Sequence, residues 1–355
     1  MVTLLNTVKS WLFQGFQVPS ILFGIFTLYY LLMDRALRNA LNNHVIIAIV
    51  FVGLILQCID VTALTYWYRT GTVLVSTKAF CSTWTSVHTI GLIGVTNLVA
   101  WASIERHILI FHANLVRTKT KRFFLHYLPL VICMMCPGVF YITIFFIIPC
   151  SATMSYSTVD CGYYNCVYNN PSAELYDSIV NYMIPPFIIV IFSVALIIRV
   201  LASKCRTRQR IQWRNYRKMA TPLLSISFLY MIFYCPLILL YTAYSAGLSR
   251  DVAAGYYPVS SYLAYYAVTF TPFICTLSLP ELRTKFKICF PCCRRCRATV
   301  GPQSLMMTRT KAGPAAGLTA GPIAGPTASP TAGPTAVPTA SPAPSPQAAI
   351  AAIAK

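Results

Sequence analysis

The sequence predicts an all-α membrane protein: a seven-transmembrane helix bundle with a short amphipathic helix on the inner membrane surface and a disordered C-terminal tail. Three observations predict this fold class. Only 10% of the 355 residues are charged and 57% are hydrophobic, whereas a soluble domain carries about 25% charged residues. Seven apolar runs follow one another along the chain. Basic residues gather in alternate connections between those runs.

All the apolar runs but the first exceed the length of roughly 20 residues that a helix needs to cross a bilayer. Charged residues, Gly, Pro or polar clusters bound each run. Seven such runs in succession argue against buried helices of a soluble core. The first run is the shortest, and its helix could begin as early as Trp11. The expected spans are Val18–Met33, Val45–Tyr66, Cys81–Ser103, Phe124–Ile148, Val180–Leu201, Ala220–Ala243 and Pro258–Leu279.

The basic residues indicate how the bundle is oriented, because Lys and Arg accumulate in cytoplasmic loops. They crowd the first, third and fifth connections and the segment after the last run. The other side holds only Lys9, Arg69, Lys78 and Arg250. We expect a multi-pass plasma-membrane protein with an extracellular N-terminus and a cytoplasmic C-terminus. The net charge of +20 is then explained by contact with anionic membrane lipids, and nucleic acid is not an expected partner.

Four segments follow from this organisation. Residues 1–17 are expected to be a short extracellular N-terminus without a cleavable signal peptide, and residues 18–279 to form the bundle. Residues 280–297 contain a juxtamembrane helix, opened by Pro280, and a cluster of cysteines. Residues 298–355 repeat Pro, Ala, Gly and Thr, as in "AGPTASPTAGPTAVPTASPAP". Such a composition predicts a disordered cytoplasmic tail.

Four cysteines are expected on the outer side: Cys81, Cys150, Cys161 and Cys166. An even number in an oxidising compartment favours disulfides. Four cysteines allow three pairings, and the sequence alone does not choose among them. We favour Cys81–Cys166, with Cys150–Cys161 closing a local loop.

Another four cysteines lie at the inner membrane surface: Cys289, Cys292, Cys293 and Cys296. Juxtamembrane cysteines indicate reversible palmitoylation. The alternative is a zinc knuckle, but two abutting CxxC pairs leave little chain to wrap a tetrahedral site. We therefore favour lipidation and expect neither a metal nor a cofactor.

A charged cluster, Glu105-Arg106-His107, follows the third apolar run and places Arg106 25 residues after Cys81. Alone, it could be an interfacial ion pair. Together with seven helices and an outer cysteine at the head of the third, it resembles the rhodopsin-like G-protein-coupled receptors, whose motif there is Asp/Glu-Arg-Tyr/His. The resemblance implies that Arg106 contacts a heterotrimeric G protein on activation and that Glu105 restrains it at rest. Arrestin and a receptor kinase are further partners that it implies.

Two more motifs support this resemblance over about residues 18–297. "FYCP", from Phe233 through Tyr234 to Pro236, is similar to the family's Cys-Trp-x-Pro, and Pro236 is expected to kink the helix. Thr271, Pro272 and Cys275 stand where the family has Asn-Pro-x-x-Tyr. These residues are the expected kink and switch positions.

Candidate ligand-pocket residues begin with Asp60, because a carboxylate inside a membrane run is costly and indicates function. His88 lies seven residues after Cys81, where amine receptors of the family carry Asp, so a typical amine is not expected. Tyrosines with hydrogen-bonding hydroxyls complete the expected pocket: Tyr234, Tyr262, Tyr265 and Tyr266. A peptide or another small extracellular molecule is the expected ligand.

Other function classes are less well supported. The sequence has no HExxH, GxSxG or P-loop motif, so we do not expect an enzyme. Transporters usually show repeated halves and several buried ionisable groups, and neither pattern stands out here. A multi-pass transporter remains the alternative, as does a degenerate receptor that does not signal.

Overall fold

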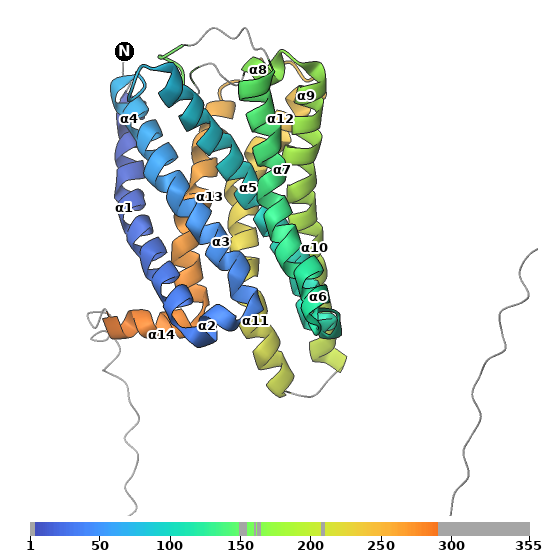
Figure 1. The fold of residues 1–355 in the computed structure, drawn as a ribbon. Coiled ribbons are helices and arrows are strands. Elements are labelled where there is room, and N and C mark those ends of the chain that lie inside the picture. The colour runs from blue at the N-terminus through green and yellow to red at the C-terminus, as the bar shows by residue number, and fades with distance from the viewer. Residues whose placement is uncertain (1–3, 149–154, 160, 162–164, 207–209, 290–355) are drawn as a thin grey trace, which may run out of the picture. The chain divides into compact units, whose positions relative to one another are not determined.

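The chain folds into a bundle of long helices, without a β-strand among the residues that the structure describes (Figure 1). The structure is a computed structural model that describes residues 4–148, 155–159, 161, 165–206 and 210–289. Five helical stretches are long and apolar enough to cross a membrane, and the number rises to seven if each of two bent helix pairs contributes one span. The predicted fold class is therefore confirmed. The predicted disordered tail lies outside the described residues.

The seven spans are built from consecutive helical elements, four of which are π-helical segments (η1, η3, η4 and η5). The first three spans are α1 (Leu4–Met33), the run of α3 (Leu41–Leu56), η1 (Gln57–Val61) and α4 (Thr62–Thr70), and α5 (Lys78–Phe111). The next two are the run of α6 (Lys119–Arg122), η3 (Phe123–Tyr127), α7 (Leu128–Ile142) and η4 (Thr143–Ile147), and the run of α9 (Pro171–Tyr176), η5 (Asp177–Met183) and α10 (Ile184–Arg206). The last two are α11 (Arg210–Phe233) with α12 (Cys235–Ser245), and α13 (Tyr257–Ser278). Short helices α2 (Arg35–Asn39), η2 (Ala113–Val116), α8 (Asn165–Tyr168) and α14 (Pro280–Cys289) lie between or after the spans.

The two ends of the bundle differ in chemistry. One end carries a disulfide bond at the start of α5 together with α8 and α9, and we call it the disulfide end (Figure 1). The opposite end carries α2, α6 and α14, with the basic residues of these helices, and we call it the basic end (Figure 1).

Pro236 bends the sixth span, as predicted. The axes of the α11 part after Thr221 and of α12 meet at 50°, and the break falls at Tyr234. Proline has no backbone N–H to continue the helical ladder, so the helix restarts with Pro236 in the first turn of α12. Pro272 has a milder effect, because α13 continues through it to Ser278.

The predicted surface helix is present as α14, which turns 91° away from α13. It packs back on the bundle through Leu282, which is fully buried, whereas Ile288 is exposed. The Phe286 ring lies 5.0 Å from the ring of Phe23 and 5.6 Å from that of Phe26 in α1. The Lys285 ammonium pairs with Asp34 at 2.9 Å, which lowers the pKa of that carboxyl and fastens α14 beside α2.

Helix α1 begins at Leu4, well before the expected Val18. Pro19 lies inside α1, which runs through it without a break. The turns of α1 before Val18 contain polar residues that lower the mean hydropathy of this segment. Two of these polar residues, Ser10 and Gln17, nevertheless face the bundle and are buried. Phe13, which is also fully buried, packs against the rings of tyrosines in α4 and α13.

Helix α5 also extends further than expected, to Phe111 instead of Ser103. Thr77 caps its start by accepting a hydrogen bond from the Phe80 amide at 3.3 Å. Glu105, Arg106 and His107 therefore lie within the helix rather than at its end. Helix α5 packs against α3, α7, α10 and α11 and runs through the centre of the bundle.

The disulfide pairing differs from the one we favoured. Cys81 bonds to Cys161, with a Cα–Cα distance of 5.9 Å, so both Cys81–Cys166 and Cys150–Cys161 were wrong. A backbone hydrogen bond from the Ser155 amide to the Cys161 carbonyl (3.1 Å) folds this segment into a turn above α5. Cys166 is disulfide-bonded too, and Cys150 lies outside the described residues.

Replacing Cys161 by Ser should destabilise the protein by about 2–5 kcal/mol, because the bond closes a loop across a sequence separation of 80. Thermal unfolding in detergent should show the same loss for Cys81→Ser and no further loss in the double variant. Cys58→Ser, at an exposed free cysteine, is the control. A disulfide-linked Cys81–Cys166 peptide in a non-reduced digest would contradict this pairing.

Candidate functional site

A cavity of about 510 Å³ opens at the disulfide end of the bundle. Helices α4, α5, α12 and α13 and the segment 157–159 contribute to its wall. Aromatic rings dominate its lining: Trp67, Tyr68, Trp84, Tyr182, Tyr234, Tyr241, Tyr257, Tyr262 and Tyr265. A mostly apolar cavity of this size with a few converging polar groups is typical of small-molecule sites.

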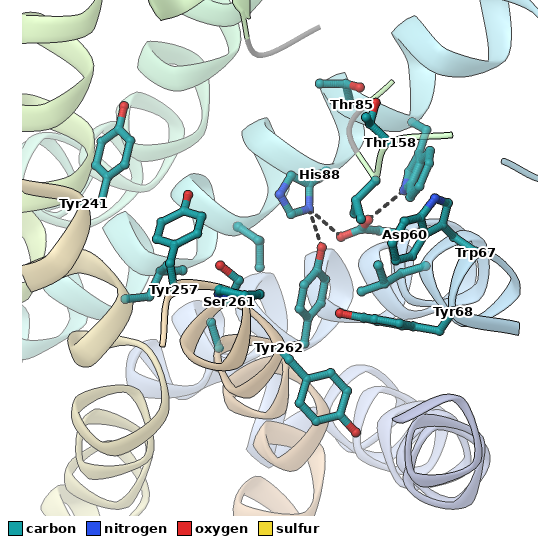
Figure 2. A pocket seen from close by; sticks show the side chains of 18 of the residues that line it. Asp60, Trp67, Tyr68, Thr85, His88, Thr158, Tyr241, Tyr257, Ser261 and Tyr262 are labelled. Atoms are coloured by element: carbon teal, nitrogen blue, oxygen red, sulfur yellow. Dashed lines mark hydrogen bonds and ion pairs between the residues drawn. The ribbon is translucent and has the colours of Figure 1, made fainter. Parts of the chain in front are cut away.

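Asp60 and His88 form the polar centre of one cavity wall (Figure 2). The Asp60 carboxylate accepts hydrogen bonds from Trp84 Nε1 at 2.8 Å and from His88 Nδ1 at 2.9 Å. The same Nδ1 lies 3.0 Å from the Tyr265 hydroxyl. Because a carboxylate only accepts hydrogen bonds, Nδ1 carries the imidazole proton in this arrangement.

The side chains of Asp60 and His88 differ in exposure, and this indicates different roles for them. The Asp60 side chain is 1% exposed, whereas that of His88 is 31% exposed. Asp60 lies in η1, and π-helical turns often occur at functional sites because they re-aim side chains. A molecule in the cavity therefore meets His88 directly, and Asp60 orients and polarises that imidazole from behind.

The predicted tyrosines do not all reach the cavity. Tyr234, Tyr262 and Tyr265 line it. The Tyr266 hydroxyl bonds to that of Tyr262 at 2.7 Å, and its ring stacks on Phe270. Tyr266 thus supports the cavity wall from outside.

A second buried carboxylate, which the sequence analysis missed, lies behind the opposite wall. Asp177 is fully buried at the start of η5 and accepts hydrogen bonds from Tyr141 at 2.6 Å, Asn181 at 2.8 Å and Tyr241 at 3.3 Å. Tyr241 lines the cavity, and Figure 2 shows it across the cavity from Asp60. Asp177 therefore positions a ring of the cavity wall.

A local signal could have found Asp177. Asn170 caps α9 by accepting a hydrogen bond from the Ala173 amide at 3.2 Å, and Pro171 occupies the first turn. Asn followed by Pro is a helix-start signal. It would have moved the fifth span back from Val180 and brought Asp177 inside it.

At the basic end, the three residues of the charged motif are all buried. Arg106 is 1% exposed, and its Nη2 donates a hydrogen bond to the Asn42 carbonyl of α3 at 3.0 Å. His107 Nε2 donates to the Phe192 carbonyl of α10 at 2.8 Å. These two residues thus tie α5 to helices on either side of it.

The resemblance led us to expect that Glu105 pairs with Arg106, but the structure does not show this pair. Its carboxyl group hydrogen-bonds to His126 Nδ1 of η3 instead. Among the described residues, no ion pair joins a carboxylate to the Arg106 guanidinium. The physical reason is that His126, fully buried beside α5, offers a ring nitrogen that the Glu105 carboxyl group reaches directly.

The expected switch positions in α13 are buried in the bundle. The Thr271 hydroxyl donates to the Ala267 carbonyl of its own helix at 2.7 Å. Cys275 is fully buried among apolar residues. Phe233 packs on the rings of Tyr266 and Phe270 in α13, so the bend of the sixth span is in contact with the seventh.

Of the predicted lipidation residues, the structure describes one. Cys289 is exposed at the end of α14, with its sulfur 3.3 Å from the Tyr30 hydroxyl. Cys292, Cys293 and Cys296 lie outside the described residues.

The arrangement of seven spans followed by a surface helix defines the rhodopsin-like membrane fold. The crystal structure of squid rhodopsin matches with a TM-score of 0.63 and 13% sequence identity, over 82% of this chain and 87% of that one. No protein-family model and no curated protein sequence matches the chain. The similarity to squid rhodopsin is thus one of fold.

Replacing Tyr141 by Phe should destabilise the protein by about 1–3 kcal/mol, because the buried Asp177 carboxylate loses a hydrogen-bond donor. Thermal unfolding of the purified protein measures the loss. Tyr176→Phe, which alters an exposed tyrosine on the neighbouring helix α9, should have no comparable effect. Equal stability of the two variants would remove Tyr141 as a partner of Asp177.

Proposed function

We propose that this protein is a cell-surface receptor that binds an extracellular ligand in the cavity and activates heterotrimeric G proteins through Arg106. One observation carries the proposal: helix α5 presents His88 to the cavity and buries Arg106 at the opposite, basic end. The two residues are 18 positions apart, or roughly 27 Å along a helix. A single rigid element thus connects a ligand-sized cavity with a buried cation at the far end.

The cavity chemistry supports a neutral or cationic ligand. Among the described lining residues, Asp60 is the acidic side chain and none is Lys or Arg. An anionic ligand would have to be desolvated there without a permanent cation to pair with, which is costly. The many aromatic faces suit apolar groups and cations alike. A peptide or small molecule that reaches His88 fits these conditions, whereas a typical amine ligand is disfavoured because His88 replaces the amine-binding Asp.

The orientation supports this function. The basic end is cytoplasmic and the disulfide end is extracellular in our proposal, because Lys and Arg accumulate on the cytoplasmic side and disulfides form in oxidising compartments. The protein is then a multi-pass plasma-membrane protein with an outer N-terminus and an inner C-terminus. Arrestin, a receptor kinase and membrane lipids are further partners, and Cys289 and the cysteines after it are lipidation sites.

Agonist-dependent nucleotide exchange on a G protein, found through a ligand-library screen, tests the proposal. Arg106→Ala should lower the exchange by about tenfold or more, within the usual range of coupling free energies. Arg117→Ala, at an exposed arginine of the same end, is the control. Substrate flux without nucleotide exchange would identify a transporter. The absence of both flux and exchange would favour the non-signalling receptor. Exchange that is unchanged in Arg106→Ala would contradict the role of Arg106.

Replacing Asp60 by Asn should reduce agonist potency by about 10- to 100-fold, because the charge-assisted hydrogen bonds that orient His88 are each worth about 1.5–3 kcal/mol. The concentration of agonist giving half-maximal exchange measures the effect. Asp251→Asn, whose carboxylate bonds to Ser249 on the exposed surface, should leave potency unchanged. Equal potencies for the two variants would remove Asp60 from the ligand site.

A further inference from the structure

A chain of three hydrogen bonds crosses the basic end of the bundle and joins four elements. The Glu105 carboxylate of α5 bonds to His126 Nδ1 of η3. His126 Nε2 lies 2.9 Å from His44 Nδ1 of α3. His44 Nε2 lies 2.8 Å from the Arg38 carbonyl oxygen of α2. Neither ligand binding nor the contact of Arg106 with Asn42 requires these two imidazoles.

The Glu105–His126 end of these hydrogen bonds is shielded from water, whereas His44 is half-buried and its bond to the Arg38 carbonyl lies at the exposed surface. His126 is fully buried, and Glu105 is 1% exposed. Tyr127 stacks on His44 at 5.7 Å between ring centroids, and the His44 and His126 rings are 5.1 Å apart. The buried polar atoms of Glu105 and His126 depend on one another for hydrogen bonds, because an unmade bond in a buried site costs about 1–3 kcal/mol.

The number of protons in this chain follows from its two ends. The Glu105 carboxylate and the Arg38 carbonyl both accept hydrogen bonds, and neither donates one. Three hydrogen bonds need three hydrogens, yet two neutral imidazoles supply only two. The third proton must reside on one imidazole, making it an imidazolium, or on Glu105, making it a carboxylic acid that donates to His126.

We propose that Glu105, His126 and His44 form a proton-binding site, and that its proton docks the segment Ala113–Tyr127 onto α3. In the occupied form the three side chains together carry no net charge, and all three hydrogen bonds are made. When the proton leaves, two lone pairs face each other in one of the three gaps, and that hydrogen bond is lost. Raising the pH should therefore release η3 from α3 and, through their contacts with η3, loosen α6 and η2.

The charges around the site act on this equilibrium in a consistent direction. Arg106 is the neighbour of Glu105 on α5, and α6, which packs against η3, contributes Lys119, Lys121 and Arg122. Tyr127 lies over His44. Within α2, the Arg38 guanidinium bonds to the Leu32 carbonyl at 3.2 Å. The lysines and arginines among these groups oppose an added positive charge, whereas the Glu105 carboxylate attracts one.

Direct measurement of the proton is feasible because the whole protein has only five histidines, so few imidazole signals overlap. Full-length protein with ¹⁵N-labelled histidine in lipid nanodiscs gives the protonation state of His44 and His126 by NMR. Infrared difference spectra against Glu105→Gln report the carboxyl. We expect one imidazolium in the pair, or a protonated Glu105 with two neutral imidazoles. An ionised Glu105 beside two neutral imidazoles across the whole pH range at which the protein is folded would overturn the proposal.

The docking is tested by hydrogen–deuterium exchange of residues 113–127 in the same nanodiscs over a range of pH, corrected for intrinsic exchange. In the unaltered protein, exchange should rise by about tenfold as the proton leaves, which corresponds to one lost hydrogen bond. His112→Asn, at an exposed histidine next to the segment, should behave in the same way. Neither measurement needs a ligand or a G protein, so its result is independent of the receptor function.

Two variants should abolish the pH dependence in opposite ways. The Glu105→Gln amide can donate to His126, so neutral imidazoles complete the chain and the segment should stay docked at all pH values. His44→Phe keeps a ring in place but breaks the chain, so the segment should exchange fast at all pH values. Persistence of the normal pH dependence in Glu105→Gln would overturn the proposal, even if His44→Phe failed to fold.

Discussion

The need to hold carboxylates inside an apolar bundle shapes this structure more than any other constraint. Asp60, Glu105 and Asp177 are each at most 1% exposed, and an isolated charge in such surroundings would cost many kcal/mol. Each is held by a hydrogen-bond partner from another helix: Trp84 and His88 for Asp60, His126 for Glu105, and Tyr141 for Asp177. Because the hydrogen bonds of each carboxylate join two or more spans, they fix how the helices pack.

Helix α5 takes part in the hydrogen bonds of two of these three carboxylates, Asp60 and Glu105. A displacement of α5 would therefore change contacts at both ends of the bundle. Near the disulfide end it donates to Asp60 of η1, and near the basic end its Glu105 hydrogen-bonds to η3 while Arg106 donates to α3. Small displacements of a packed helix are resisted by close-packed side chains but can switch between discrete hydrogen-bond arrangements. A change at the cavity that shifts α5 therefore alters polar contacts at the far end without any longer-range force.

The sequence was sufficient for features that depend on composition or on one residue, such as the spans, the bend at Pro236 and the surface helix α14. It was insufficient where an outcome depends on which surfaces meet. Asp60 stood out because an acid in an apolar run is conspicuous, whereas Asp177 lay at the edge of a run. The Cys81–Cys161 pairing depends on the turn formed by residues 155–161, and the Glu105–His126 pair depends on how η3 lies against α5. Neither arrangement leaves a local pattern in the sequence.

The partner of Glu105 also changes what holds Arg106. In the expected arrangement a carboxylate would neutralise the guanidinium, and the pair would resist separation by charge attraction. Here Glu105 is engaged by His126, and the described contact of Arg106 is one hydrogen bond to the Asn42 carbonyl. A hydrogen bond to a neutral carbonyl is weaker than an ion pair in the same low-dielectric surroundings. The position of Arg106 is thus set mainly by the packing of α3 against α5, and a shift between these two helices is sufficient to free it.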